Sequence, residues 1–398
     1  SSAITIRGAK SIDKNNSPIF VVDGMILQEP LKGNIDGTDW GSQLKNLNPD
    51  DYESVTVLKG AAATALYGSR GANGAIVIVS KGGKFGKQGL GVELSQTMEM
   101  MDIYASPIRL QNVYGMGNPT NGFEGGLMSD GKLQRNTQRS FGPKMDGQMY
   151  DQYFLNGEAT PYVPHPDNWK AFYQNGSYSN TNMSITGGNE KTSFRASYSY
   201  TDNKGSFKFN EFTRNAISFK FLSQLNKVFS VESGVSYAFS HAQNGASQGG
   251  WAWDTNLSLL TTYYMPRNLD LATYQEVYRD PVTHAVENTS PYGTLRAYLH
   301  KRDMNKNERW EQSLLSYLNL KAQITPWLDA SIKGNYNYYG ISYMQKEYGT
   351  GVNYSGGGYY GRGGSISGGY NLLGLLHSGQ KYMNDDLTVD LMVAGEVY

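Results

Sequence analysis

The stretch VLKGAAATALYGSRGANGAIVIVSKGG, which runs from Val57 to Gly83, decides how the rest of the chain is interpreted. It follows directly on a short apolar run, and its residues 60–67 are small and compatible with a helix. Gly68 stands where such a helix would end. The run 75–79 has the β-branched pattern of a strand that is buried on both faces. The stretch therefore predicts a strand, a short helix, a glycine turn and a buried strand.

The residues before this stretch are also expected to form compact α/β structure. Residues 3–7 and 18–22 have the pattern of strands, and the turn pair Asp23-Gly24 closes the second of them. The run Asn48-Pro49-Asp50-Asp51 predicts a helix start, with a cap residue, a proline in first position and acids in the first turn. On these patterns alone, residues 1–83 would be a small α/β unit of any function.

Length and composition restrict the class of protein. The 398 residues are enough for two or more domains. Lys and Arg total 35, as do Asp and Glu, so there is no basic excess to favour a nucleic-acid partner. No window holds the ~18 consecutive apolar residues that a membrane-spanning helix needs. A membrane β-barrel stays compatible with the polar average hydropathy, because its wall alternates apolar and polar residues.

After Lys87 the sequence alternates between apolar and polar residues with a period of two. In the segment 192–201, for example, Phe194 and Tyr198 oppose Arg195 and Ser197. This period over about ten residues is typical of a transmembrane β-strand. The segments with this pattern, the first two of them weaker, are 92–100, 182–187, 192–201, 216–226, 229–239, 314–324, 328–338 and 387–393. They predict an antiparallel sheet of about eight strands.

Alternation also divides the side chains between two faces. Polar side chains predicted to share one face are Lys220, Glu232, Ser236, Lys321, Lys333, Asn335 and Asn337, while Phe219, Val235, Tyr237 and Ile332 are predicted on the other. In a barrel the polar set would face the lumen and the apolar set the lipid.

The connections between the predicted strands alternate between short and long. Short ones lie near 188–190, 226–227 and 325–327, and the long ones are 101–181, 202–214, 241–309 and 342–385. Outer-membrane barrels have short turns at one end and long loops at the other. A soluble β-sandwich would share the alternation within its strands, but long loops at only one end favour the barrel. We therefore expect the three longest connections at the same end of the sheet.

Several motifs resemble one known family. The motif ATALYGSRGANGAI at 63–76 resembles the plug domain of SusC/RagA-type TonB-dependent outer-membrane transporters. SPIFVVDGMI at 17–26 and the block at 47–83 resemble other parts of that plug, and 180–208 resembles early barrel strands of the family. Gly60 departs from the family pattern, which usually has an acidic residue there. The loops 101–181 and 241–309 carry no such resemblance.

The resemblance implies a mainly β fold, an antiparallel transmembrane β-barrel of about 22 strands with an α/β plug domain in its lumen. Residues 1–83 would be the C-terminal part of the plug, and residues 84–398 the first part of the barrel. About eight strands would close only a narrow barrel, which could not hold a plug of about 80 residues. We therefore expect a fragment, and since no signal peptide precedes Ser1, an incomplete or processed N-terminus.

The resemblance also implies active import across the outer membrane of a Gram-negative bacterium. Substrates in this family are usually oligosaccharides or oligopeptides, a SusD-like surface lipoprotein acts as the lid, and the TonB-ExbB-ExbD complex supplies energy. Outer-membrane lipid would surround the barrel, and the family often forms a dimer of transporter–lid pairs. Transport would be a conformational cycle of the plug rather than bond chemistry.

Candidate substrate-binding residues come from loops and from the plug turn. Aromatic faces hold sugars or peptide side chains, but such residues also form interfacial girdles or contact a lid. Tyr359 and Tyr360, with Tyr354, stand in a glycine-rich stretch that is either a gate or a loop tip. The full candidate set is Trp251, Trp253, Tyr263, Tyr264, Tyr359, Tyr360, Arg70 and Asn73. For Arg70 and Asn73, a structural contact between plug and barrel is the competing interpretation.

No motif indicates catalysis, a metal site or a cofactor. The five histidines are scattered without the spacing of metal ligands, and the glycines at 68, 71 and 74 lack the pattern of a phosphate-binding loop. Three rivals to the lidded importer stay open: a siderophore- or cobalamin-type receptor without a lid, a surface adhesin or binding β-protein, and an outer-membrane enzyme.

Overall fold

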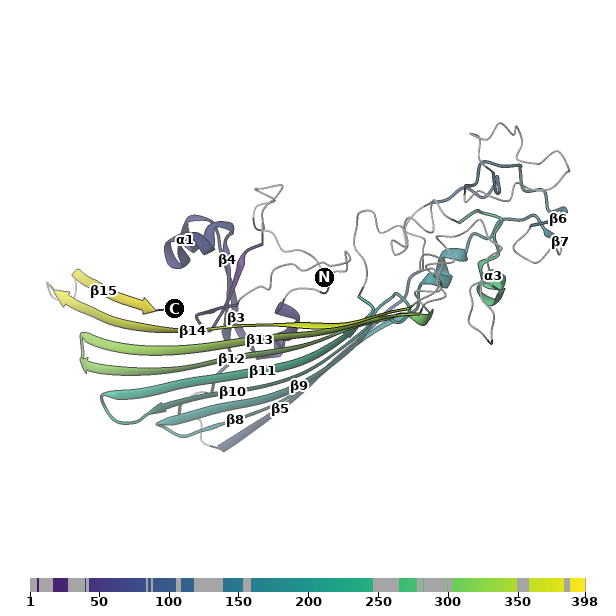
Figure 1. Ribbon diagram of the computed structural model, residues 1–398. Coiled ribbons are helices and arrows are strands. Elements are labelled where there is room, and N and C mark those ends of the chain that lie inside the picture. Colours follow the sequence, from purple (N-terminus) through teal and green to yellow (C-terminus); the bar gives the residue numbers. More distant parts are fainter. Residues whose placement is uncertain are drawn as a thin grey trace.

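The described part of the chain forms two β-sheets and a loop module. The computed structural model describes residues 6, 17–27, 40, 43–83, 85–86, 89–104, 109–117, 139–152, 159–245, 265–277, 282, 299, 303–348, 358–382 and 387–397. Figure 1 shows a small sheet lying on the concave side of a large, curved one. Within these residues, no helix has the length and apolar character needed to cross a bilayer.

The small sheet has four strands in the order β2-β1-β4-β3. Its strands are β1 (Ile19–Val22), β2 (Met25–Ile26), β3 (Tyr52–Leu58) and β4 (Ala75–Ser80). Strand β4 pairs in parallel with β1 and antiparallel with β3, and Asp23 and Gly24 form the turn between β1 and β2 with positive φ of 47° and 82°. The predicted order of strand, helix, turn and strand is confirmed, but β4 is not buried along its whole length, since Val79 is 38% exposed. The predicted strand 3–7 falls, apart from Ile6, outside the described residues.

Short helices fill the connections of the small sheet. They are η1 (Gln43–Asn46), η2 (Pro49–Asp51), α1 (Ala61–Tyr67) and η3 (Gly68–Asn73). As predicted, Asn48 caps η2, and its side chain accepts a hydrogen bond from the backbone of Asp50. Gly71 permits the tight passage from α1 to η3, because a Cβ there would lie 2.4 Å from the carbonyl oxygen of Ala63. We call the described residues 17–83 the small unit.

The large sheet is antiparallel, and its strands follow one another in chain order. They are β5 (Gly89–Met101), β8 (Gly176–Gly188), β9 (Thr192–Lys204), β10 (Glu211–Gln224), β11 (Phe229–Gln243), β12 (Lys306–Thr325), β13 (Leu328–Glu347), β14 (Tyr359–Tyr382) and β15 (Leu387–Val397). The mainly β, antiparallel fold class is thus confirmed, with nine strands in this sheet where about eight were predicted.

The additional strand corrects one predicted loop. Residues 342–385 were expected to connect two strands, but β13 continues to Glu347 and β14 occupies 359–382. Five glycines between 361 and 369 gave this segment the composition of a loop. The ladder with β13 pairs every residue from 359 to 378, and tyrosine rings cover two of the glycines, Gly361 and Gly363. A new outer connection, 348–358, remains, so that short and long connections still alternate.

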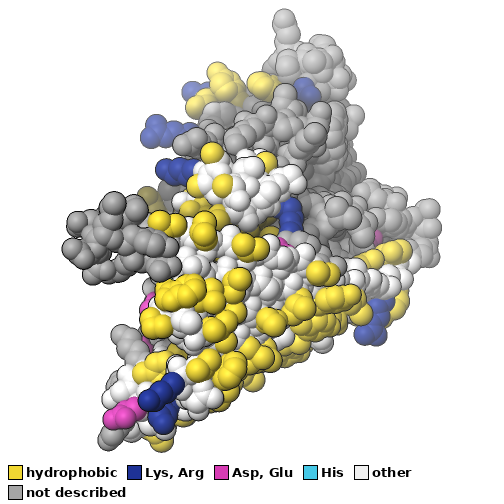
Figure 2. Space-filling model, turned by 90° about the vertical axis from the view of Figure 1, so that its left-hand side faces the viewer, with side chains coloured by type: hydrophobic (Ala, Val, Ile, Leu, Met, Phe, Trp, Pro, Cys, Tyr) yellow, Lys and Arg dark blue, Asp and Glu magenta, His cyan; other side chains and the backbone are white. Residues whose placement is uncertain are grey.

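The predicted division of the two faces is confirmed. Phe219, Val235, Tyr237 and Ile332 point away from the small unit and are 38–57% exposed. Lys220 and Lys333 point toward it and donate hydrogen bonds to it. We call these the outer and inner faces of the large sheet. Figure 2 shows hydrophobic side chains gathered along the lower flank of the molecule, which is the outer face in Figure 1.

The two longest connections fold together at one end of the large sheet, as predicted. They contribute β6 (Met149–Asp151), β7 (Ala159–Pro161), η5 (Asn168–Phe172) and α3 (Leu271–Val277), which lie beyond the right-hand end of the sheet in Figure 1. Their shared core includes Met116 and Phe172 from the first connection and Met265, Leu269, Leu271, Tyr274 and Leu299 from the second. We call these described residues the loop module and this end of the sheet the loop end.

Candidate functional site

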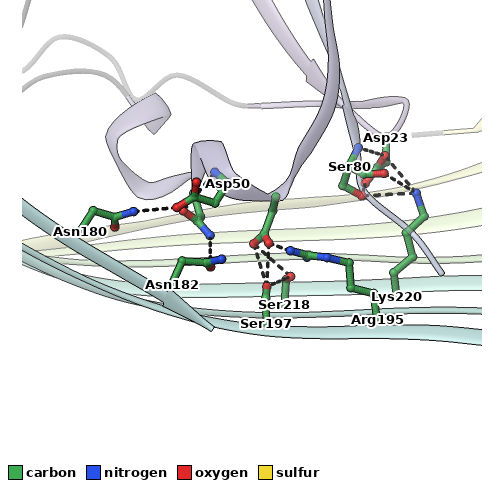
Figure 3. A network of polar contacts seen from close by, with 11 residues as sticks. Asp23, Asp50, Ser80, Asn180, Asn182, Arg195, Ser197, Ser218 and Lys220 are labelled. Atoms are coloured by element: carbon green, nitrogen blue, oxygen red, sulfur yellow. Dashed lines mark hydrogen bonds and ion pairs between the residues drawn. The ribbon is translucent and has the colours of Figure 1, made fainter. Parts of the chain in front are cut away.

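Polar side chains join the small unit to the inner face of the large sheet (Figure 3). Among them, Asp51 of η2 contacts three side chains of that sheet. Its carboxylate pairs with Arg195 at 2.5 Å and accepts hydrogen bonds from Ser197 at 2.8 Å and Ser218 at 3.1 Å. The side chains of Arg195 and Asp51 are only 4% and 13% exposed. Helix η2 therefore presents one carboxylate to two neighbouring strands, β9 and β10.

The residues beside Asp51 bond to the next strand, β8. Asn180 donates to the Asp50 carboxylate at 2.8 Å, and Asn48 donates to Asn182 at 3.0 Å (Figure 3). Because Asn48 also caps η2, the same residues that shape this short helix attach it to the sheet.

The turn between β1 and β2 makes a second contact. Asp23 accepts hydrogen bonds from the backbone of Ser80 at 2.9 Å and from its hydroxyl at 2.6 Å. Lys220 on β10 lies 3.7 Å from the Asp23 carboxylate and donates to the Ser80 carbonyl at 3.0 Å (Figure 3). Lys333 on β13 donates to the Asp23 carbonyl. One loop of the small unit is thus held by cations from two distant strands.

A third contact reverses the charges. Glu311 on β12 is 1% exposed and pairs with Lys45 of η1 at 2.7 Å and with Arg309 at 2.6 Å. The Asn46 side chain donates to the same carboxylate at 2.9 Å. Here the large sheet supplies the acid and the small unit the base, and each buried charge has a partner of opposite sign.

Backbone groups of the small unit are also bonded to the sheet. Arg214 on β10 donates to the carbonyls of Leu47 at 2.5 Å and Lys45 at 3.0 Å. These carbonyls stand at the end of η1 and just after it, where no ladder could satisfy them. Nearby, burial raises the pKa of the Tyr52 phenol well above its ordinary value, so this side chain stays neutral.

An apolar contact completes the attachment. Leu315 and Tyr317 on β12 pack into the core of the small unit with Phe20, Val22 and Met25. Beside them, a cavity of about 50 Å³ lies between the small unit and strands β10 to β12, with Asp23, Asp51, Ser80, Lys220 and Tyr317 among its lining residues. This size and polarity suit a few water molecules. The contact is therefore apolar in part, ionic in part and hydrated at its edge.

Gly234 on β11 is needed for this packing. The Tyr317 ring lies over it, and a Cβ at Gly234 would be 2.4 Å from a ring carbon. We expect Gly234→Ala to lower the free energy of unfolding by about 1–3 kcal/mol, because the buried ring must shift within the core that it shares with the small unit. Thermal unfolding of the full-length protein in detergent measures this loss. Gly334→Ala is the matched control, since its nearest neighbouring atom is 3.8 Å away, and an equal loss in both variants would contradict the steric argument.

The loop module has its own buried polar contacts. Asn268 is fully buried, accepts a hydrogen bond from the Met116 backbone at 2.7 Å and donates to Gln152 at 2.9 Å. Asn168 donates to the Leu269 carbonyl at 2.6 Å, and Arg267, 4% exposed, donates to the Gln111 carbonyl at 3.0 Å. Side chains of each connection therefore satisfy backbone groups of the other.

His165 should make the loop module sensitive to pH. Burial lowers the pKa of His165 below its ordinary value; Asp270 opposes this shift and Arg267 adds to it. The unfolded state then binds more protons near pH 6, so stability is full above the unfolded pKa of about 6.5 and falls as the pH drops through it. We expect faster hydrogen exchange of residues 159–173 at lower pH, after correction for the intrinsic pH dependence. His165→Gln should remove the additional acceleration of exchange at lower pH. If the variant kept that acceleration, His165 would be excluded as its cause.

The predicted substrate-binding residues lie in different parts of the chain, and their role in binding stays a prediction. Trp251, Trp253, Tyr263 and Tyr264 lie outside the described residues. Arg70 and Asn73 lie in η3, the first exposed and the second half-buried. Tyr359 and Tyr360 begin β14 instead of a loop. Because neighbours in a strand point to opposite faces, Tyr359 belongs to the inner face with Glu347, and Tyr360 to the outer face with Lys346.

Sequence reasoning found only part of the contact network. Alternation placed Lys220, Glu232, Lys333 and Asn337 on the inner face, and three of these four bond directly to the small unit. Asp51 was assigned only a helix-start role, and Glu311 stands just outside a predicted strand. An acid in the small unit and an inward-facing Arg or Lys on a strand were the signals in the sequence that could have indicated such ion pairs. Among the described residues, no cluster of His, Asp and Glu is arranged to hold a metal ion.

Comparison with known proteins agrees with this architecture. The family model described as "TonB-dependent Receptor Plug Domain" matches residues 1–75. TonB-dependent receptor SusC of Bacteroides thetaiotaomicron is 31% identical over 217 residues, which is 53% of this chain and 17% of SusC. TonB-dependent receptor P39 of Formosa agariphila is 25% identical over 339 residues, 85% of this chain and 27% of that receptor. The chain thus spans less than a third of these relatives.

Solved structures share the fold. The structure of the RagAB peptide transporter matches with a TM-score of 0.66 and 18% identity, over 98% of this chain and 42% of that one. The RagAB peptide importer in its closed-closed state matches with a TM-score of 0.64 and 18% identity, again over 98% and 42%. At this identity the likeness concerns the fold, including the position of a small α/β unit against a curved antiparallel sheet.

Proposed function

We propose, from the premise that this chain belongs to the SusC/RagA type of TonB-dependent receptors, that the whole protein imports a large nutrient. Import would take place across the outer membrane of a Gram-negative bacterium. The relatives it resembles in sequence are receptors and not enzymes, which supports a transport cycle without bond chemistry. The division into a plug part, 1–83, and a barrel part, 84–398, is part of this proposal.

The observation that carries the proposal is the contact network between the small unit and the large sheet. It consists of side-chain pairs that can separate and form again, because no strand of the small sheet joins the large sheet. Opposite charges such as Asp51 with Arg195 and Glu311 with Lys45 fix the position of the small unit while it is at rest. A pulling force from the TonB-ExbB-ExbD complex would separate the pairs and open a passage along the inner face.

A SusD-like lipoprotein as lid, and an oligosaccharide or oligopeptide as cargo, belong to the same proposal. Support for a partner comes from the RagAB structures, whose names describe a peptide importer in closed and open states. The loop module supports it too, since a folded unit at the loop end offers a firm surface for a lid. Assembly as a dimer of transporter–lid pairs is a further part of the proposal.

Detergent extraction of the native full-length protein from its own membranes tests this function. We expect the protein in the outer-membrane fraction, with a lipoprotein in equal amount as judged by mass spectrometry after purification. If the protein needs detergent but purifies without a partner, a siderophore- or cobalamin-type receptor is the better interpretation than a lidded importer. A protein that is soluble without detergent would contradict the transport function and favour an adhesin or another binding protein.

A further inference from the structure

The inner face of the large sheet carries a second group of residues beyond the small unit. On β13, Lys333 and Asn337 bond to the small unit, and the buried Tyr339 follows on the same face. Tyr343 comes four residues farther toward the loop end and is 38% exposed. Tyr359, on the same face of β14, is 51% exposed. These two tyrosines therefore line the wall where the small unit no longer covers it.

Both tyrosine rings lie against glycines. Gly363 is directly opposite Tyr343 in the β13–β14 ladder, and a Cβ there would be 2.4 Å from the Tyr343 hydroxyl oxygen. Gly361 stands two residues from Tyr359, and a Cβ there would be 2.5 Å from the Tyr359 hydroxyl oxygen. Each ring thus leans along the wall over bare backbone rather than standing upright. The glycines that obscured β14 in the sequence make room for these rings.

The surroundings of the two rings are polar, and the charged groups among them, Arg309 and Glu347, have partners within the protein. Gln345 separates the rings in the ladder and donates to Glu347 at 2.8 Å. Arg309, opposite Tyr343 on β12, pairs with Glu311 at 2.6 Å, a carboxylate that it shares with Lys45. Amide and hydroxyl groups, with few free charges, match sugar hydroxyls better than the charged termini and side chains of peptides.

The spacing of the rings also suits a chain-like ligand. Tyr359 is opposite Glu347, four residues beyond Tyr343 along the ladder, which corresponds to about 13 Å along the strand at 3.3 Å per residue. Flat aromatic faces attract C–H groups of a saturated ring. Two such faces in line can hold two sugars of one oligosaccharide, with at least one further sugar between them.

We infer that Tyr343 and Tyr359, seated on Gly363 and Gly361, form a binding site for a neutral oligosaccharide on the wall above the small unit. This inference rests on the proposed function and selects between its two cargo classes. The site needs no metal and no charge pairing, and its selectivity comes from ring stacking together with amide hydrogen bonds from groups such as Gln345.

An array of neutral gluco-, xylo-, manno- and galacto-oligosaccharides, with acidic oligosaccharides and peptides beside them, tests the inference. The purified full-length protein in detergent is applied to this array. We expect binding to a neutral oligosaccharide, weakened about five- to tenfold by Tyr343→Ala and by Tyr359→Ala, since each removes one stacked ring. Tyr343→Phe keeps the ring and should bind within about twofold of the original protein.

Gly363→Val provides a second variant that leaves both tyrosines in place. It should weaken binding as Tyr343→Ala does, because the ring can no longer lie on the backbone. Melting curves identify any variant that has simply lost its fold. Three results would overturn the inference. They are binding only to peptides or acidic sugars, no binding to the neutral oligosaccharides, and binding that Tyr343→Ala leaves unchanged. If the protein still purifies from the outer membrane with a lipoprotein in those cases, the proposed importer function stands without it.

Discussion

Replacing Asp51 by alanine is expected to destabilise the attachment of the small unit by about 3–5 kcal/mol. The reason is the partner that remains: Arg195, 4% exposed, would keep its charge without a carboxylate. Ser197 and Ser218 would lose their acceptor as well. Hydrogen exchange of residues 43–58 in the full-length protein measures the effect, and about 100-fold faster exchange or more corresponds to this loss.

Two further variants separate the ion pair from a general effect of truncation. Glu53→Ala removes an exposed acid two residues away and should change stability by less than about 0.5 kcal/mol. The double variant Asp51→Ala with Arg195→Met should be more stable than Asp51→Ala alone, because no unpaired charge remains. Exchange of 43–58 within twofold of the original protein in Asp51→Ala would show that the pair does not hold the small unit.

The same variant has a consequence for transport. If the small unit closes the passage, as proposed, a weaker attachment should admit large antibiotics that the intact outer membrane excludes. Greater sensitivity of cells that carry Asp51→Ala, without dependence on TonB, would fit a resting contact that normally requires force. A loss of about 3–5 kcal/mol in the attachment of the small unit would identify the Asp51–Arg195 pair as a buried contact, because an exposed ion pair contributes less.

Local patterns predicted the small unit well because its signals are local. Asn48 and Pro49 start η2, Gly68 follows the end of α1, and the run from Ala75 forms β4. Each depends on backbone preferences within a few residues. The position of this unit against the large sheet depends on pairs more than 100 residues apart, such as Asp51 with Arg195, which no local pattern contains.

The large sheet shows where periodicity succeeds and where it fails. Alternation found strands whose outer faces carry apolar side chains, such as Phe219 on β10 and Ile332 on β13. It missed β14, because Gly361, Gly363 and similar positions carry no side chain to alternate. The ring of Tyr359, from β14 itself, covers Gly361, and the ring of Tyr343 covers Gly363, so the signal for this strand lay partly in its neighbour β13.

The loop module could not be predicted in the same way. Its core joins Met116 and Phe172 to residues of the segment 265–299, and its hydrogen bonds join side chains of one connection to the backbone of the other. Neither connection has the periodicity of a long helix or strand, so the sequence indicated only two long loops. A buried amide such as Asn268 becomes recognisable only when the two connections are brought together.

Asn268→Ala is therefore expected to unfold the loop module locally, at a cost of about 3 kcal/mol. The substitution leaves the Met116 backbone N–H and the Gln152 side-chain oxygen without their partner in a fully buried place, and each unsatisfied group costs about 1–3 kcal/mol. Hydrogen exchange of residues 111–117 and 265–277 should become about 100-fold faster. The matched control is Asn112→Ala, which removes one exposed amide that accepts from Arg267 and should cost less than about 1 kcal/mol.

The place of the effect is as decisive as its size. No residue of the core of the loop module belongs to the core of the small unit, so Asn268→Ala should leave the exchange of 43–58 unchanged, and Asp51→Ala should leave 265–277 unchanged. Distant sites without shared partners are expected to behave independently. If Asn268→Ala instead loosened 43–58, the loop module and the small unit would be coupled through the large sheet. If the effects stay separate, the two units are stabilised independently, and each is held by its own buried polar contacts.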